Sequence, residues 1–144
     1  RSIMIQFSEA ISINVVPESI FALYVVVATW KHWDPEVASS SITGAFISGV
    51  AGTLRPTQGL ETTFRITSVE KNKSFTAEFG LPLCTATFEH ELLPSGHSTR
   101  VIHRVTFKGF LAFIFGRLVG SQIRKGLPGT MQGLKRAAES TTAT

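Results

Sequence analysis

Apolar and polar residues alternate through the middle of the chain, from Ser41 to Lys108, and short turns interrupt the alternation. Alternation of this kind places every second side chain on the same face of a β-strand. The turns, among them Gln58-Gly59, are short, and strands joined by short turns pair antiparallel. The segment therefore predicts an antiparallel sheet of six strands, of which the first is "SITGAF", starting at Ser41.

The N-terminal segment predicts one more strand, followed by two short helices. One face of the predicted strand "IMIQFSEAISINV" is apolar and is formed by Ile3, Ile5, Phe7, Ile11, Ile13 and Val15. Glu9 is the one break in that apolar face. Pro17 suits the first turn of a helix, and Glu18 follows it near the positive helix end. A second short helix is expected to reach Trp33.

The last third of the chain predicts one long helix. Its apolar stripe has helical spacing and consists of Leu111, Phe115, Leu118, Ile123, Leu127, Met131, Leu134 and Ala138. Such a helix is about 40 Å long, which is enough to cross an entire sheet. Pro128 stands among Gly126, Gly129 and Gly133. Because proline removes a backbone hydrogen bond and clashes one turn back, we expect a kink or break near Gly126.

The composition favours a chain that builds apolar surface. Its 144 residues fit a single domain over residues 1–144. Hydrophobic residues make up 43% of the chain and charged residues only 17%, and Phe occurs 11 times. A cavity lined with Phe would use this excess, and so would a surface for a partner.

Charge and cysteine content exclude several classes of protein. The net charge is +4, but Lys and Arg are scattered and no nucleic-acid-binding motif occurs, so we expect no nucleic-acid partner. The single cysteine, Cys84, excludes an internal disulfide and a multi-cysteine metal site, and we expect no cofactor. No signal peptide is recognisable, and "FLAFIFGRLVG" is too short to span a bilayer, so a cytoplasmic location is expected.

A set of motifs in a fixed order gives the chain a family resemblance. These are "INVVPESIFALY", "WKHWDPEV", "ITGAF", "GVAGTLRP", "FEHELLPSGHSTRVIHRVTFKG" and "GLKRAAE", and their order gives a resemblance over nearly the whole chain, from about Ile5 to Glu139. In this order they resemble the SRPBCC superfamily, whose helix-grip fold is shared by START lipid-transfer domains, birch-pollen-type allergens and the polyketide cyclase/dehydrase family. The last of these is the most similar.

The resemblance implies an α+β fold in which a curved antiparallel sheet of about seven strands surrounds a long C-terminal helix, with two short helices after the first strand. It also implies a cavity between sheet and helix that takes an apolar or amphipathic small molecule, such as a lipid, a quinone or an aromatic polyketide-like compound. No catalytic residue is carried over from the motifs.

The cluster "WKHWDPEV" raises the question of a metal site. His32, Asp34 and Glu36 would share one face of a strand, but Pro35 and the helical approach argue against a strand there. No second ligand set accompanies them, so no metal is expected. Trp33 is interpreted as a packing anchor at the end of the second helix, or as a residue at the mouth of a cavity.

Three ionisable residues, Glu9, His90 and His103, fall on the apolar faces of their predicted strands. Ionisable groups on a buried face are costly unless they are paired or hydrated. Facing a cavity, they could bind a ligand or act as general acid and base. The alternative is a one-residue shift of register at a bulge, which would turn these side chains toward water.

Other candidates to line the cavity are the apolar residues Phe64, Phe79, Phe88, Phe107, Phe115 and Leu118, for which ordinary core packing is the alternative. Arg55 could enter the pocket and bind an acidic group of a ligand, or it could be solvated. Cys84 has no neighbouring cation to activate it and is interpreted as an inert core residue.

Three functions remain open from the sequence. The first is a carrier or sensor of a hydrophobic small molecule. The second is a polyketide cyclase or dehydratase that uses the cavity histidines or Glu9 as acid and base, so that enzyme activity is left undecided. The third is contact with a peripheral membrane surface or a protein through the basic final helix, which carries Arg117, Arg124, Lys125, Lys135 and Arg136. A monomer and a homodimer are both compatible with the sequence.

Overall fold

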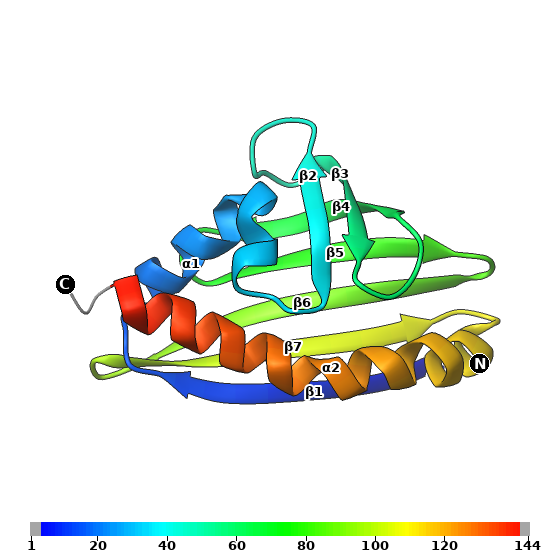
Figure 1. The fold of residues 1–144 in the computed structure, drawn as a ribbon. Helices are drawn as coiled ribbons and strands as arrows, with labels where there is room; N and C mark the ends of the chain where they lie inside the picture. Colours follow the sequence, from blue (N-terminus) through cyan, green and yellow to red (C-terminus); the bar gives the residue numbers. More distant parts are fainter. Residues whose placement is uncertain (1–3, 142–144) are drawn as a thin grey trace.

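One seven-stranded antiparallel sheet, crossed by a long helix, forms the protein in a computed structural model that describes residues 4–141 (Figure 1). In chain order the elements are β1 (Met4–Ile13), α1 (Pro17–Val25), the short 3-10 helix η1 (Val27–His32), β2 (Val37–Ile42), β3 (Ala51–Pro56), β4 (Thr62–Glu70), β5 (Ser74–Leu81), β6 (Cys84–Ser95), β7 (Ser98–Lys108) and α2 (Ala112–Thr141). The strand order is β1-β7-β6-β5-β4-β3-β2. The predicted helix-grip architecture is confirmed, although Ile3 of the first strand lies outside the described residues.

The alternating pattern is preserved in the three neighbouring strands β5, β6 and β7. The buried face of β7 consists of Thr99, Val101, His103, Val105 and Phe107. Strands β6 and β7 pair without a register shift from Thr85 to Ser95, which rules out the alternative of a bulge at the histidines. Side chains that alternate in sequence therefore lie together on the face that α2 covers.

The predicted boundaries of two strands are wrong. Strand β2 begins at Val37, whose side chain is buried, and ends at Ile42, whereas "SITGAF" was expected to form the strand. Pairing of Ser39–Ile42 with Gly52–Arg55 leaves residues 43–50 as the connecting loop. In "LETTFRITSVEK" the alternation of Leu60 with Phe64 and Ile66 predicts that β4 begins at Leu60. Leu60 instead precedes that strand and is 86% exposed.

Helix α2 is continuous through Pro128, so the predicted break near Gly126 does not occur. Proline cannot donate to the carbonyl four residues earlier, which belongs to Arg124. Both Pro128 and Arg124 are exposed, so water can reach this part of the helix surface and compensate for the lost hydrogen bond. The helix can therefore run unbroken along the sheet.

The glycines of α2 mark where other segments approach the helix most closely. A Cβ atom at Gly133 would overlap the carbonyl oxygen of Trp33, and one at Gly126 would overlap the carboxylate of Glu36. Nearer the start of the helix, a Cβ at Gly116 would lie 2.6 Å from the side chain of Ile5. Glycine costs about 1 kcal/mol relative to alanine in a helix. Here the missing side chains allow two segments to pack directly against the helix backbone. One is the turn after η1, and the other is strand β1.

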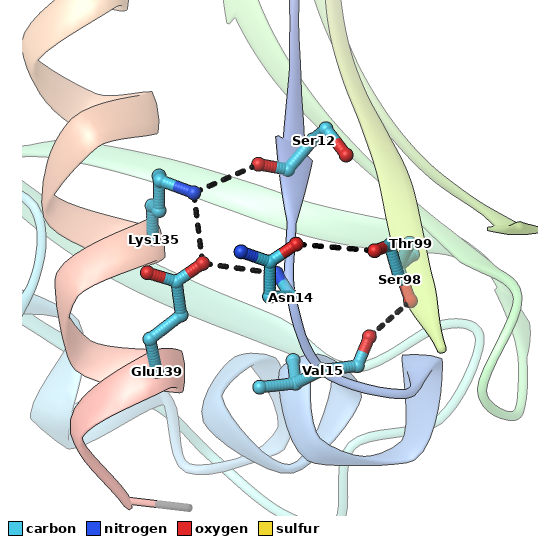
Figure 2. A network of polar contacts seen from close by, with 7 residues as sticks. All are labelled: Ser12, Asn14, Val15, Ser98, Thr99, Lys135 and Glu139. Atoms are coloured by element: carbon cyan, nitrogen blue, oxygen red, sulfur yellow. Dashed lines mark hydrogen bonds and ion pairs between the residues drawn. The ribbon is translucent and has the colours of Figure 1, made fainter. Parts of the chain in front are cut away.

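The C-terminal end of α2 is fastened to β1 by a small polar network (Figure 2). The ammonium group of Lys135 donates to the backbone carbonyl of Ser12 at 3.1 Å and to Oε2 of Glu139 at 2.8 Å. The same carboxylate oxygen accepts the backbone N–H of Asn14 at 2.9 Å. The hydrogen bond from Lys135, followed by that from Asn14, lowers the pKa of Glu139. This network fixes where the helix crosses the end of the sheet.

Candidate functional site

A cavity of about 310 Å³ lies between the sheet, helix α2 and the turn that follows η1. This volume falls at the lower end of the range of small-molecule sites, which is roughly 300–1,000 Å³. Most of the wall formed by the sheet comes from β5, β6 and β7, and β3 and β4 add Leu54, Pro56 and Thr62. The inward-facing residues of β5, β6 and β7 are Phe75, Ala77, Phe79, Ala86, Phe88, His90, His103, Val105 and Phe107. The interior is therefore mainly apolar, with two imidazoles set into one wall.

Some of the residues predicted to line a cavity do so, and the structure brings them together. They are Trp33, Phe79, Phe88, His90, His103 and Phe107. All except Trp33 come from the alternating pattern of β5, β6 and β7, where adjacent antiparallel strands place matching faces side by side. Trp33, which follows the last residue of η1 as its C-cap, contributes to the same cavity.

Glu9 and Arg55 were expected in the cavity, and the structure places both outside it. Glu9 is the pairing partner of His103 in the β1–β7 ladder, but it lies half-buried on the edge strand and does not line the cavity. The side chain of Arg55 is 61% exposed and lies 4.0 Å from the carboxylate of Glu61. The solvated alternative therefore holds for Arg55, and Glu9 does not join His90 and His103 inside the cavity.

The expectation that Phe64, Phe115 and Leu118 line the cavity is also corrected. Phe64 is buried behind the wall, where its ring stacks on Trp30 with centroids 6.0 Å apart. Phe115 packs against the apolar cluster that contains Phe7. Leu118 is 70% exposed because it points away from the sheet. The apolar stripe read from the helix was thus too wide, since it included a residue of the outer face.

Polar groups gather in one part of the cavity wall. The hydroxyl of Tyr24 lies 2.8 Å from Nε2 of His103, and both side chains are buried. Nδ1 of His90 donates to the carbonyl oxygen of Phe75 at 3.1 Å, and the His90 ring stacks on the Phe75 ring with centroids 3.8 Å apart. The two imidazoles meet edge to face, with centroids 4.5 Å apart. Tyr24, His90 and His103 therefore form one connected cluster.

Burial determines the charge of this cluster. It lowers the pKa of His90 from 6.5 to about 4. Burial, and then the neighbouring His90, keep the pKa of His103 well below its ordinary value, while burial raises that of Tyr24. All three groups are therefore neutral at pH 7. Since the Phe75 carbonyl can only accept, the proton of neutral His90 is on Nδ1, and its Nε2 is left as a hydrogen-bond acceptor.

Trp33 supplies a donor that has no partner. Its side chain is 7% exposed and lines the cavity, and its Nε1 is buried without a hydrogen bond; within residues 4–141 no other buried side-chain nitrogen or oxygen lacks one. Leaving such a donor unsatisfied costs about 1–3 kcal/mol. Trp30, by contrast, donates its Nε1 proton to the carbonyl oxygen of Tyr24 at 3.0 Å. Trp33 thus lines the cavity while its indole N–H is enclosed without a hydrogen-bond partner.

Exposed lining residues mark the opening of the cavity. Glu36, Gln58 and Gln122 line it and are also exposed to solvent. Nε2 of Gln122 donates to Oε1 of Gln58 at 3.0 Å, which bridges α2 and the β3–β4 connection. The two side chains therefore form a polar bridge across the opening.

The turn after η1 is held to α2 by a partly buried polar contact. Thr130 donates its hydroxyl proton to Oδ1 of Asp34 at 2.7 Å, and the backbone N–H of Glu36 donates to the same oxygen at 3.0 Å. Burial raises the pKa of Asp34, although both hydrogen bonds oppose the shift. Among residues 4–141, no group of three His, Cys, Asp or Glu side chains is arranged to hold a metal ion. Asp34 thus helps to close the cavity, with Thr130 as its partner.

Several residues of the site were not recognised from the sequence. Tyr24 is one of them, because its partner His103 is 79 residues away and no local pattern connects the two. Gln58 lies in a turn and Gln122 on a helix surface, 64 residues apart. Glutamine is common at both kinds of position, so neither residue stood out in the sequence. One signal was present for Tyr24, since it is the single tyrosine of a chain that has 11 Phe.

An antiparallel sheet and a long helix with an apolar cavity between them define a helix-grip, START-like domain. The model of the family "Polyketide cyclase / dehydrase and lipid transport" matches residues 4–139, and the chain belongs to this family. Membership implies binding of a hydrophobic small molecule. A comparison with curated proteins gives no match. In the part of the chain that the structure describes, no helix is both long and apolar enough to cross a membrane.

Solved structures share the fold at low sequence identity. The Zhui aromatase/cyclase from Streptomyces sp. R1128 has a TM-score of 0.78 and 10% identity, with 94% of each chain covered. A START superfamily protein from Mycobacterium smegmatis has a TM-score of 0.76 and 16% identity, with 95% of this chain and 99% of that chain covered. Ara h 8.0201 has a TM-score of 0.74 and 14% identity, with the same two coverages.

Proposed function

We propose that the protein binds a neutral, largely apolar molecule in this cavity and orients it through one hydrogen-bonding end. The observation that carries the proposal is a mainly apolar cavity lined by Trp33, whose enclosed indole N–H has no partner and could reach a ligand after a small rotation of the ring. A ligand oxygen that accepts this proton would remove the cost of the unsatisfied donor. Nε2 of His90 offers an acceptor for a ligand hydroxyl. A ketone, or a phenol next to a carbonyl, has the chemistry that fits both groups.

The energetics favour a neutral ligand over a charged one. Burial of roughly 300 Å² of apolar ligand surface contributes about 7 kcal/mol, before the entropic costs of association are subtracted. A carboxylate placed near His90 and His103 would lose its hydration and meet neutral imidazoles. Arg104, the cation that lines the cavity, already lies 3.6 Å from the carboxylate of Glu89. An anionic ligand therefore gains little there.

The test compares two probes of similar size, 2-acetylnaphthalene and 2-ethylnaphthalene, by fluorescence titration. We expect the ketone to bind about fivefold more tightly, because a hydrogen bond contributes about 1 kcal/mol. In Trp33→Phe the preference for the ketone should disappear. Trp30→Phe is the matched control, since it removes an indole whose N–H already has the Tyr24 carbonyl as partner, and it should keep the preference. Failure of both probes to bind would overturn the proposal, as would a preference that survives in Trp33→Phe.

A second candidate is an enzyme of the cyclase or dehydratase type, in which His90 moves a proton on the bound molecule. The supporting observation is that His90 lines the cavity beside the hydrogen-bonded pair of Tyr24 and His103. The low pKa of His90 counts against a strong base, since general bases work best with a pKa near the operating pH. Turnover of a polyketide surrogate that is unchanged in both His90→Gln and His103→Gln would exclude this candidate.

A further inference from the structure

The outward side of the first half of α2 is unusually apolar for a helix surface. Phe113, Ile114 and Leu118 are 51%, 45% and 70% exposed, and Phe110, just before the helix, is 77% exposed. A surface helix normally turns polar residues toward solvent. Leu83, in the β5–β6 turn, is also exposed, and its carbonyl accepts the N–H of Leu111, so it adjoins the same end of the helix.

Cations are interleaved with these apolar residues. Arg117, Arg124 and Lys125 are exposed along the same stretch of α2, and the guanidinium of Arg117 lies over the ring of Phe113, 4.5 Å from its centroid. The sequence contains no Asp or Glu from residue 108 to residue 138. We define the α2 outer face as Phe110, Phe113, Ile114, Arg117, Leu118, Arg124 and Lys125. It combines apolar side chains with positive charge that no acidic residue of the helix offsets.

We propose that the α2 outer face docks on an anionic lipid membrane. A helix with exposed aromatic and aliphatic side chains among Lys and Arg is suited to lie in the plane of a bilayer surface, where it inserts the apolar groups and attracts acidic headgroups. A second copy of the chain, joined through the same face, would set Arg117, Arg124 and Lys125 against equal charges. The positive charge thus selects an anionic surface over self-association.

The position of this face relative to the cavity supports a membrane as the partner. Gln122 follows Leu118 by one helical turn, so the two side chains are neighbours on the helix. Gln122 and Val119 line the cavity, and Gln122 bridges to Gln58 across its opening. Docking by the α2 outer face would therefore bring the opening next to the lipid. This surface adds a partner to the proposed binding function and does not depend on it.

Cosedimentation with vesicles tests the proposal. The protein should bind phosphatidylcholine vesicles that contain phosphatidylserine, bind pure phosphatidylcholine vesicles much less, and dissociate as salt is raised. Each surface cation contributes about fivefold to partitioning, so Arg117→Gln, Arg124→Gln and Lys125→Gln combined should lower binding on the order of a hundredfold. Phe110→Ser with Phe113→Ser should also weaken binding, because the inserted apolar area is lost.

Matched controls keep the result specific. Lys31→Gln with Lys71→Gln removes exposed cations elsewhere, and Leu60→Ser removes an exposed leucine from the β3–β4 connection. These variants should bind vesicles like the wild type. All variants should still bind 2-acetylnaphthalene in solution, because none of the changed residues lines the cavity. No vesicle binding, equal losses in the control variants, or association with acidic protein or nucleic acid in place of vesicles would overturn the proposal.

Discussion

The backbone carbonyl of Trp33 lies against Gly133 so closely that a Cβ atom on this glycine would overlap it. The turn that follows Trp33 is thereby seated on α2, where Thr130 binds Asp34. Because Trp33 also lines the cavity, this contact fixes the distance between one wall and the helix. The glycines that make α2 a poor helix by propensity thus determine the shape of the site.

Gly133→Ala should destabilise the protein. Overpacking of this kind costs about 1–3 kcal/mol, which exceeds the gain of about 1 kcal/mol from helix propensity. The free energy of unfolding, measured by urea titration, should fall. Gly129→Ala is the control, because its Cβ would lie at an ordinary 3.6 Å from Pro35 and the helix propensity is gained without a clash. A Gly133→Ala protein as stable as Gly129→Ala would contradict the observed packing.

Acid should destabilise the protein through His90. Its pKa is 6.5 in the unfolded chain and about 4 in the folded protein, so between these values the unfolded state holds the additional proton. The contribution of neutral His90 is fully present above pH 6.5 and is lost as the pH falls toward 4. At 1.4 kcal/mol per pH unit the loss is about 3 kcal/mol.

The measurement is the free energy of unfolding of wild type and His90→Gln from pH 7 to pH 4. The stability of the wild type should fall more steeply, by about 3 kcal/mol over this range, because Gln does not titrate. His103 should act in the same direction, since its pKa is also lowered. His97→Gln, in an exposed turn, should keep the steep wild-type profile. Parallel curves for wild type and His90→Gln would show that folding does not lower the pKa of His90.

Ala86→Leu should fill part of the cavity. Ala86 is buried and lines the cavity from β6, so the larger side chain occupies space that the ligand would use. Affinity for 2-acetylnaphthalene should fall tenfold or more, about 1.4 kcal/mol, while the free energy of unfolding stays equal or rises as apolar area is buried. Ala28→Leu, on the exposed side of η1, should change neither quantity. Undiminished affinity in Ala86→Leu would place the ligand elsewhere.

Removal of the bridge between Gln122 and Gln58 should speed ligand exchange. An exposed hydrogen bond contributes about 0.5–1 kcal/mol, so Gln122→Ala should raise the dissociation rate about two- to fivefold. Stopped-flow displacement of the fluorescent probe measures this rate. Ser121→Ala changes the neighbouring residue, whose hydroxyl bonds only within the helix, and should leave the rate unaltered. Equal rates in Gln122→Ala and wild type would show that the ligand does not pass this bridge.

The fold was predictable because its signals are local. Alternation in β5, β6 and β7 identified the face that lines the cavity, including His90 and His103, and the apolar stripe identified α2. Strand β2 was misplaced because its one buried terminal residue, Val37, comes directly after a turn. The break expected near Gly126 was wrong because the helix surface around Pro128 is solvated.

The details of the site were less predictable because they depend on distant partners. Glu9 obeys the alternation of β1, yet that strand is at the sheet edge and the cavity lies farther inside. Leu118 follows Phe115 by three residues, as in a helical stripe, but it precedes the buried Leu127 by two and a half turns and therefore lies on the opposite, exposed face. The partner of Tyr24 and the absence of a partner for Trp33 Nε1 arise only when the sheet, η1 and α2 are assembled.

Strand β1 joins the sheet beside β7, the strand farthest from it in sequence (Figure 1). Thr99 donates its hydroxyl proton to the carbonyl of Val15, a residue 84 positions earlier. Strands β2 to β7, in contrast, pair in order as successive hairpins. Closing the long loop costs more entropy than closing any hairpin, so we expect it to be a late step of folding. During synthesis on a ribosome, the binding site would therefore form only after α2 has emerged and β1 has paired with β7.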